Sequence, residues 1–431
     1  MIISRRSFLK LAGSAAAVGA VSGTMSGCAT SSSRGAGGHV VVVGGGFGGA
    51  ACAKYIRHFD PSVKVTLVDA ALSNYYTCPF SNLVLAGDMK MDEIKVSFET
   101  LKNKHGVTLV EDHVDGVDAD ARIVKLKSGK TLSYDRLVLS PGIQLNYEKV
   151  AGYSKAVSEK LPHAWKAGAQ TVTLRKQLEA MPDGGTFLMV APPNPYRCPP
   201  GPYERACMVA DYFKRHKPKS KIVILDPKDK FSKQGLFVEA WDTLYPGMID
   251  WVSPERGGVV ASVDAASMSV KTKDGDTIKA DVINIIPPMQ AGKIVTASGL
   301  ADDKGWAPVN QRSFESTKAK NIYVIGDSCI AGPVPKSGYG ANSEAKIAAS
   351  AIVQSLNDAE LIVPKWVNTC YSYVSAQDAI SVAGVYELNA EGKIIEIKGS
   401  GGVSAKGGKN WKAEAVYAKG WYEGIRDDTW G

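Results

Sequence analysis

The stretch "HVVVVGGGFGGAACAKYIRHF", residues 39–59, decides the fold predicted for this chain. Its four valines are typical of a buried strand, a glycine-rich turn follows, and the remainder has the pattern of a helix. Gly44, Gly46 and Gly49 fit the G-x-G-x-x-G spacing in that strand–turn–helix context. The first glycine permits a tight turn, the second lets a pyrophosphate approach the backbone, and the third lets helix and strand pack closely. The stretch therefore predicts a dinucleotide-binding domain.

Two further elements extend this prediction. "KVTLVDA", residues 64–70, is predicted as a strand ending at Asp69, an acid placed to bind ribose hydroxyls. "NIYVIGDSCIAGPVPKSGYGANSEAKIAASAIV", residues 321–353, resembles the second FAD signature of glutathione-reductase-like flavoproteins. In that signature the aspartate, here in Gly326-Asp327, holds the ribityl chain. A helix starting near Ser337 and Gly338 would aim its positive end at the flavin.

The alternation of strands and helices repeats after residue 150. "GTFLMVAPP" and "SKIVILDP" are predicted as strands on either side of a helix from Tyr203, which makes a second βαβ unit. The predicted class is α/β, with two Rossmann-like dinucleotide-binding domains, the FAD domain being discontinuous, and a small C-terminal domain. The predicted segments are a leader and linker (1–36), the FAD domain (37–150 and 290–354), the second Rossmann-like domain (151–289) and the C-terminal domain (355–431).

The first turn of the second domain is unusual. It contains "NPYRCPPGPYER", residues 194–205, where a nucleotide-binding relative would carry glycines. Prolines remove backbone N–H donors and fix φ, so this loop cannot form the same phosphate cradle. We therefore expect no NAD(P)H binding, and Cys198 becomes the candidate entry point for electrons.

The N-terminus predicts export. "SRRSFLKLAGSAAAVGAVSG", residues 4–23, joins paired arginines to a stretch rich in Ala and Gly, as in a twin-arginine leader. We expect a periplasmic protein exported in the folded state. "MSGC", residues 25–28, resembles a lipoprotein cleavage box, which leaves open a lipid anchor at Cys28 or ordinary leader cleavage.

The composition disfavours nucleic-acid binding, a transmembrane helix, and a haem or metal site in this chain. The net charge of +8 includes no basic cluster that would indicate nucleic-acid binding. No stretch approaches the ~20 apolar residues of a transmembrane helix. The seven cysteines form no C-x-x-C or C-x-x-C-H, and the six histidines are scattered, so neither haem nor metal is expected in this chain.

Taken together, the motifs resemble one family closely, the flavoprotein subunit of flavocytochrome c sulfide dehydrogenase. The resemblance implies oxidation of sulfide, with FAD as cofactor and a c-type cytochrome subunit as partner in a heterodimer. The motifs that carry it are "VVVVGGGFGGA", "NYYTCPFSN", "LPHAWKAG", "YRCPPGPYER", "INIIPPMQAGKI", "VIGDSCI", "PKSGYGANS", "NTCYSY" and "WYEGIRDDTWG".

The resemblance also implies roles for single residues. Cys78 matches the cysteine that holds FAD through a thioether; the alternative is a small buried thiol. Cys198 and Cys370 match a redox-active disulfide beside the flavin; the alternative is a purely structural bridge. Glu204 is the expected proton acceptor, or else a carboxylate favoured by its helix N-terminus. The predicted cofactor-binding residues are Gly44, Gly46, Phe47, Gly49, Asp69, Cys78, Val114, Gly326, Asp327, Ser337 and Gly338.

Three functions stay open at this level. Besides the cytochrome-linked dehydrogenase, the chain could be a sulfide:quinone oxidoreductase, which shares the fold and the cysteine pair. The third is an accessory flavoprotein of a thiosulfate-oxidation system. The tail, residues 399–431, is expected to have no long apolar face for docking on a membrane, which disfavours quinone. Its aromatic residues are expected to be core, flavin cover or a partner interface.

Overall fold

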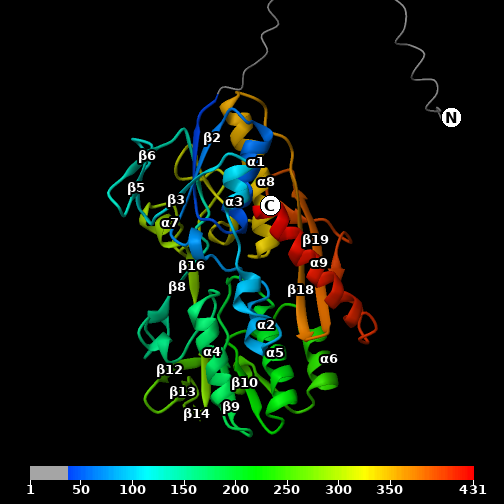
Figure 1. Ribbon diagram of the computed structural model, residues 1–431. Helices are drawn as coiled ribbons and strands as arrows, with labels where there is room; N and C mark the ends of the chain where they lie inside the picture. The colour runs from blue at the N-terminus through cyan, green and yellow to red at the C-terminus, as the bar shows by residue number, and fades with distance from the viewer. Residues whose placement is uncertain (1–36) are drawn as a thin grey trace, which may run out of the picture. The chain divides into compact units, whose positions relative to one another are not determined.

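The computed structural model describes residues 37–431, so the predicted leader and Cys28 lie outside the described residues. A five-stranded sheet contains the opening stretch (Figure 1). Its neighbours all pair in parallel, in the order β17 (Ile322–Val324), β7 (Arg136–Leu139), β1 (His39–Val43), β2 (Lys64–Asp69), β3 (Thr108–Glu111). Because β17 joins β7 from far along the chain, the discontinuous domain of the prediction is confirmed.

A second parallel sheet repeats this plan. It has the order β11 (Ile249–Val252), β10 (Lys221–Leu225), β9 (Thr186–Val190), β15 (Val282–Ile285). Each half also carries a three-stranded antiparallel sheet. One is β4 (Val114–Asp118), β5 (Ile123–Leu126), β6 (Thr131–Ser133), and the other is β12 (Val260–Asp264), β13 (Ser269–Thr272), β14 (Thr277–Lys279). The order β3-β2-β1-β7 matches β11-β10-β9-β15, so the predicted α/β class with two Rossmann-like domains is confirmed.

Helices cover the sheets and position the site. The α-helices of the two halves are α1 (Phe47–Phe59), α2 (Ser81–Ala86), α3 (Glu99–Asn103), α4 (Ala169–Ala180), α5 (Gly201–His216), α6 (Gln234–Leu244), α7 (Lys293–Ala297) and α8 (Gly338–Leu356). The α8 helix starts where predicted, because the Ser337 hydroxyl accepts a hydrogen bond from the Gly340 N–H and caps it. Alanines such as Ala51 and Ala348 are fully buried, and their small size lets α1 and α8 pack closely.

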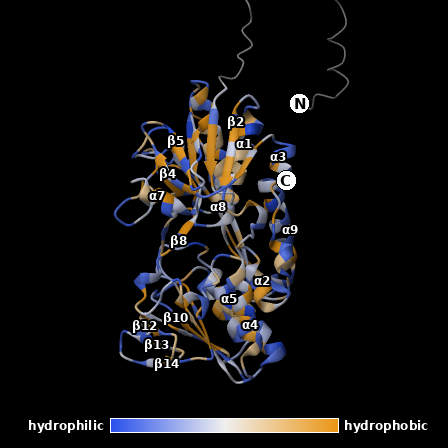
Figure 2. Ribbon diagram, turned by 60° about the vertical axis from the view of Figure 1, so that its left-hand side comes forward, coloured by the Kyte–Doolittle hydropathy of each residue, from blue (hydrophilic) through white to orange (hydrophobic). Residues whose placement is uncertain are grey.

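Two short strands connect the two halves. β8 (Ile143–Leu145) leaves the first half and β16 (Met289–Ala291) returns to it, and they pair antiparallel. The chain therefore crosses between the halves twice at the same place. Figure 2 shows apolar ribbon concentrated in the strands of both parallel sheets, as expected for strands covered on two faces.

The C-terminal segment adds a hairpin and a helix. The strands are β18 (Lys365–Ser375), β19 (Asp378–Leu388), β20 (Ile394–Glu396) and β21 (Gly402–Val403), and α9 (Trp411–Trp430) follows. The expectation of no long apolar face in this tail is wrong. The α9 helix buries Trp411, Ala418, Tyr422 and Ile425 on one side, packed against the hairpin and α1. Within residues 37–431, no helix combines the length and apolar character needed to cross a membrane.

The end of α9 closes over the glycine turn. The Trp430 indole N–H donates to the Gly45 carbonyl at 3.1 Å, and its ring meets Phe47 edge-on at 4.7 Å between centroids. The ring also lies 6.1 Å from that of Tyr75. Only 4% of Trp430 is exposed. The last turn of the chain thus holds the predicted nucleotide-binding turn in place.

We expect Trp430→Ala to lower the free energy of unfolding by about 3–5 kcal/mol, because it removes a buried aromatic ring and leaves a cavity. Guanidinium unfolding followed by tryptophan fluorescence and circular dichroism measures this loss. Tyr417→Ala on the same helix is the control, since Tyr417 is 60% exposed. Equal effects of the two substitutions would show that the contact with the glycine turn does not stabilise the fold.

Candidate active site

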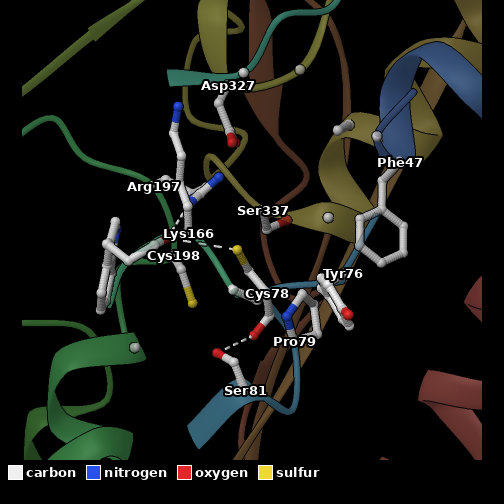
Figure 3. A pocket seen from close by; sticks show the side chains of 18 of the residues that line it. Phe47, Tyr76, Cys78, Pro79, Ser81, Lys166, Arg197, Cys198, Asp327 and Ser337 are labelled. Carbon is white, nitrogen blue, oxygen red and sulfur yellow. Dashed lines mark hydrogen bonds between the residues drawn. The ribbon is translucent and has the colours of Figure 1, made fainter. Parts of the chain in front are cut away.

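Most of the predicted site residues line one cavity of about 370 Å³ (Figure 3). The predicted residues that line it are Gly44, Gly46, Phe47, Asp69, Cys78, Cys198, Glu204, Gly326, Asp327, Ser337, Gly338 and Cys370. Gly49 and Val114 are not among the lining residues. A Cβ at Gly49 would overlap the Gly44 carbonyl oxygen, so this glycine serves the close packing of α1. Val114 begins β4 and is not part of the cavity lining.

The glycine turn fits a pyrophosphate. Gly44 has φ +102°, a conformation that favours glycine, and a Cβ there would overlap the Ser140 carbonyl. A Cβ at Gly46 would lie 2.8 Å from the Tyr75 hydroxyl. The α1 helix begins directly after this turn with no side-chain cap and no acid in its first turn. Its first N–H groups are therefore available to an anion.

Two aspartates fit the rest of an FAD molecule. The Asp69 carboxylate accepts hydrogen bonds from the N–H groups of Gly45 (2.7 Å) and Ala71 (2.8 Å), which fix it beside the turn. Asp327 Oδ1 is buried and has no hydrogen-bond partner among the described residues. Burial raises the pKa of this carboxyl. An unpaired buried oxygen costs roughly 1–3 kcal/mol, and a ribityl hydroxyl would satisfy it. The cavity thus fits the FAD that the sequence predicts.

The Cys78 thiol faces this cavity (Figure 3). Its Sγ donates to the Trp165 carbonyl at 3.6 Å, and the Arg197 guanidinium donates to the same oxygen. The Ser81 hydroxyl donates to the Cys78 carbonyl at 2.7 Å. Cys78 is therefore held at the surface of the cofactor cavity, which fits the predicted thioether. The covalent attachment itself stays a prediction.

Cys198 is fixed by the backbone around it. It has φ +59°, which is uncommon for a residue with a side chain. Its N–H donates to the Lys336 carbonyl at 2.8 Å, and its own carbonyl accepts from the Gly201 N–H at 2.8 Å. A Cβ at Gly201 would come within 2.9 Å of the Cys198 sulfur, so glycine is needed there. The proline-rich loop thereby places a thiol of the second half against the FAD half.

Cys370 reaches the same cavity from β18. Residues two apart on a strand share a face, so Asn368, Cys370 and Ser372 point the same way. The Asn368 side-chain oxygen accepts from the Ser337 hydroxyl at 2.6 Å, which joins this face to the start of α8. The fold thus brings Cys370 to the cavity that Cys198 lines.

The predicted disulfide between these two residues is not formed. All six described cysteines are free, so Cys198 and Cys370 are both thiols in this structure. Two thiols are the reduced form of a redox-active pair, whereas the prediction described its oxidised form. Cys52, Cys207 and Cys329 are buried away from this pair.

Glu204 is both a helix N-terminal residue and a cavity residue. It lies in the first turn of α5 and lines the cavity with the two cysteines. Its Oε2 accepts from the Asn82 side-chain amide at 2.7 Å, and its Oε1 accepts from the Tyr373 N–H at 2.9 Å. Burial raises the pKa of this carboxyl. Asn82 was missed from the sequence, although it ends the "NYYTCPFSN" motif.

Arg205 is a second residue that the sequence did not single out. It is only 1% exposed and donates to the carbonyls of His163 (2.8 Å) and Ala164 (2.6 Å). Its Nε donates to the Asn82 side-chain oxygen at 3.1 Å. Arg205 therefore holds the segment before Trp165 and orients the amide that binds Glu204. Its place beside Glu204 in the chain was the only signal.

The second half has no free acid where a nucleotide-binding relative would need one. Asp226 directly follows β10, the position of a ribose-binding carboxylate. Its Oδ2 accepts from the Tyr203 hydroxyl (2.5 Å) and the Trp251 indole (3.0 Å), and its Oδ1 pairs with Lys228 Nζ (2.7 Å). These contacts occupy both oxygens, so they support the interpretation that this half does not bind NAD(P)H.

A buried carboxyl supports the Gly326-Asp327 turn from below. Glu344 Oε2 accepts from the Gly326 N–H at 2.6 Å and from the Cys329 thiol at 3.5 Å. Burial raises the pKa of Glu344 to about 8. The carboxyl is therefore protonated in the folded protein over much of the pH range in which ordinary glutamates are charged.

Comparisons with known proteins place this geometry in a family. "Sulfide dehydrogenase [flavocytochrome c] flavoprotein chain, central" matches residues 171–287, and "Flavocytochrome c sulphide dehydrogenase, flavin-binding" matches residues 362–430. "Pyridine nucleotide-disulphide oxidoreductase" matches residues 38–177. The sulfide dehydrogenase flavoprotein chain of Chlorobaculum thiosulfatiphilum is 64% identical over 45 residues, covering 10% of this chain and 92% of that one. The chain belongs to the family of flavocytochrome c sulfide dehydrogenase flavoproteins.

This flavoprotein also has longer, more distant relatives. The mitochondrial sulfide:quinone oxidoreductase of Dictyostelium discoideum is 25% identical over 322 residues, covering 72% of this chain and 69% of that one. The solved sulfide:quinone oxidoreductase of Aquifex aeolicus has a TM-score of 0.68 at 20% identity, covering 91% of this chain and 92% of that one. The chain is thus a sulfide-oxidising FAD protein.

We expect Glu344→Gln to flatten the pH dependence of stability. The raised pKa means that the folded flavoprotein binds this proton more tightly than the unfolded chain. The resulting stability is complete below pH 4.5 and is lost as the pH rises through about 8. Glutamine keeps an acceptor for the Gly326 N–H and does not ionise. As the pH rises from about 5 to about 8, the free energy of unfolding of the variant should increase by roughly 2–5 kcal/mol relative to that of the parent.

Guanidinium unfolding at a series of pH values measures this gain. Glu423→Gln is the control, since Glu423 is exposed on α9. A difference between parent and Glu344→Gln that stays constant with pH would contradict the protonated state of Glu344.

Proposed function

We propose that this chain is the periplasmic sulfide-oxidising subunit of a flavocytochrome c and passes its electrons to a c-type cytochrome subunit. The observation that carries the proposal is that Cys198, Cys370 and Glu204 line the same cavity as the residues that fit FAD. The twin-arginine motif of residues 4–23 supports the location. The printed name of the C. thiosulfatiphilum relative, a flavoprotein chain of a flavocytochrome c, supports the partner.

The oxidised cysteine pair is the proposed acceptor of sulfide. Glu204 accepts a proton from hydrogen sulfide, and the hydrosulfide attacks one sulfur of the disulfide. The S–S bond breaks, one cysteine becomes a persulfide, and the other leaves as a thiolate with the bonding electron pair. Asn82 and the Tyr373 N–H hold the Glu204 carboxyl during this transfer, and Arg197 holds the anionic substrate near. Bound FAD supplies a two-electron acceptor that can release electrons singly.

Quinone is the rival acceptor, because the longer relatives are sulfide:quinone oxidoreductases. The packing of α9 supports the cytochrome instead. Three of its large side chains, Trp411, Tyr422 and Ile425, are buried against the protein, so these three are not available to a membrane surface. Steady-state assays with sulfide and either a c-type cytochrome or a short-chain quinone compare the two acceptors directly. Faster turnover with the quinone would overturn the cytochrome assignment.

We expect sulfide to reduce the flavin only when Cys198 is intact. Cys198→Ser should slow anaerobic bleaching of the flavin absorbance by roughly 10³-fold or more, because the variant cannot form the disulfide. Stopped-flow mixing with sulfide measures the rate. Cys207→Ala is the control, since Cys207 is buried on α5 and contacts the Trp241 indole. Unchanged bleaching in Cys198→Ser would remove the pair from the reaction.

We expect FAD to be attached through Cys78. Acid precipitation of the parent should leave the yellow colour in the pellet, and a peptide containing Cys78 should carry the flavin mass. Cys78→Ser should release all its FAD into the supernatant, because serine cannot form the thioether. Cys52→Ala serves as the matched control within α1. Release of FAD from the parent protein would exclude covalent attachment.

A further inference from the structure

Lys233 is a buried cation without an ion-pair partner among the described residues. It directly precedes α6, with φ +57°, and only 9% of it is exposed. Its ammonium donates to the Ser372 hydroxyl at 2.8 Å and to the Ile380 carbonyl at 3.4 Å, on the paired strands β18 and β19 (Figure 1). Lys228, five residues earlier, pairs with Asp226 at 2.7 Å. Burying an ammonium is costly unless a nearby group balances its charge.

The acidic groups that interact electrostatically with the Lys233 ammonium come from four parts of the chain. They are Cys370 on β18, Glu204 on α5, Cys198 in the proline-rich loop and Glu414 on α9. Burial lowers the pKa of Lys233, and Cys370 is the strongest of the groups that oppose this. Both Glu204 oxygens accept hydrogen bonds from other donors, and Glu414 Oε2 accepts from the Ser404 hydroxyl at 2.6 Å. The Cys370 thiol, which donates to the Tyr371 carbonyl at 3.6 Å, is the acidic group that interacts most strongly with the cation.

The two thiols of the pair differ in their surroundings. Burial raises the pKa of Cys370, the Glu204 carboxylate raises it further, and the Lys233 ammonium opposes both. Burial raises the pKa of Cys198 well above its ordinary value. The cation that opposes this is Arg197, which donates to the Trp165 carbonyl and also faces Cys78 and Asp327. Cys198 comes after Cys78 and Asp327 among the groups that interact with Arg197, whereas Cys370 comes first among those that interact with Lys233.

Position on the strand supports the same asymmetry. Ser372, which accepts from the Lys233 ammonium, lies two residues after Cys370 on the same face of β18. The cation is thereby held along the row of side chains that contains this thiol. We propose that Lys233 is a positioning residue that stabilises the thiolate of Cys370, in preference to that of Cys198, when the cysteine pair is reduced.

The proposal predicts which sulfur the hydrosulfide attacks, and this consequence rests on the proposed function. A better stabilised thiolate is the better leaving group in thiol–disulfide exchange. The hydrosulfide therefore bonds to the Cys198 sulfur, the S–S bond breaks, and Cys370 leaves with the electron pair as a thiolate beside Lys233. The product carries the persulfide on Cys198. Atoms and charge balance, since one anion is consumed and one is formed.

Alkylation of the reduced holoprotein tests the proposal without sulfide. The protein is reduced anaerobically, treated briefly with iodoacetamide between about pH 5 and pH 10, and digested, and the two cysteines are followed by mass spectrometry. In the parent, we expect the alkylation rate of Cys370 to reach half of its maximum at a lower pH than the alkylation rate of Cys198. Lys233→Met should move the Cys370 profile up by about one pH unit or more, a tenfold slower reaction at a fixed lower pH. Lys233→Arg should restore it.

Lys230→Met is the matched control, because Lys230 is exposed three residues earlier. A purely structural Lys233 would give the same profiles in Lys233→Arg, Lys233→Met and Lys230→Met, and this result would overturn the proposal. The parent protein tests it without any variant, since alkylation of Cys198 before Cys370 would also overturn it. If the profiles behave as expected but sulfide leaves the flavin oxidised, Lys233 keeps its assignment and the proposed function fails.

Discussion

The site depends on the two hydrogen bonds that the buried Glu204 carboxyl accepts. It accepts one hydrogen bond from Asn82 on α2 and one from the backbone of Tyr373 on β18, while it is itself part of α5. A buried carboxylate is unfavourable unless its lone pairs are satisfied, so these donors must stay in place. The segments that carry Cys198 and Cys370 are thereby held at one cavity. The Arg205 Nε donates to the Asn82 side-chain oxygen and orients its amide toward Glu204.

The two halves of the chain share a nucleotide-binding architecture but differ at the site. Both halves share a strand order, but only the first retains an open glycine turn. In the second half the Asp226 carboxylate accepts hydrogen bonds from Tyr203 and Trp251 and pairs with Lys228. The turn after β9 carries prolines and Cys198. This turn, where a nucleotide-binding relative would carry glycines, thus presents a sulfur atom to the cavity that the glycine turn of the first half also lines.

The fold was largely predictable because its signals are local. Glycines, strand-ending acids and apolar runs restrict the backbone within a few residues, so β1, β2, β17 and the start of α8 were located from sequence. The long amphipathic α9 was missed, because glycines and alanines in residues 399–431 obscure the pattern that its buried aromatics follow. The disulfide was predicted from a resemblance, and the structure instead contains two thiols.

The sequence by itself determined the class of fold and the cofactor turn, since these depend on short motifs with their own geometry, while the proposed reactive pair, Cys198 and Cys370, came from a family resemblance. Only the tertiary structure decided that Cys370 faces the same cavity as Cys198, and that Asn82, Arg205 and Lys233 surround them. These contacts join residues more than a hundred positions apart. Their physical cause is the balance of buried charge, which no local pattern records because it exists only after the chain has folded.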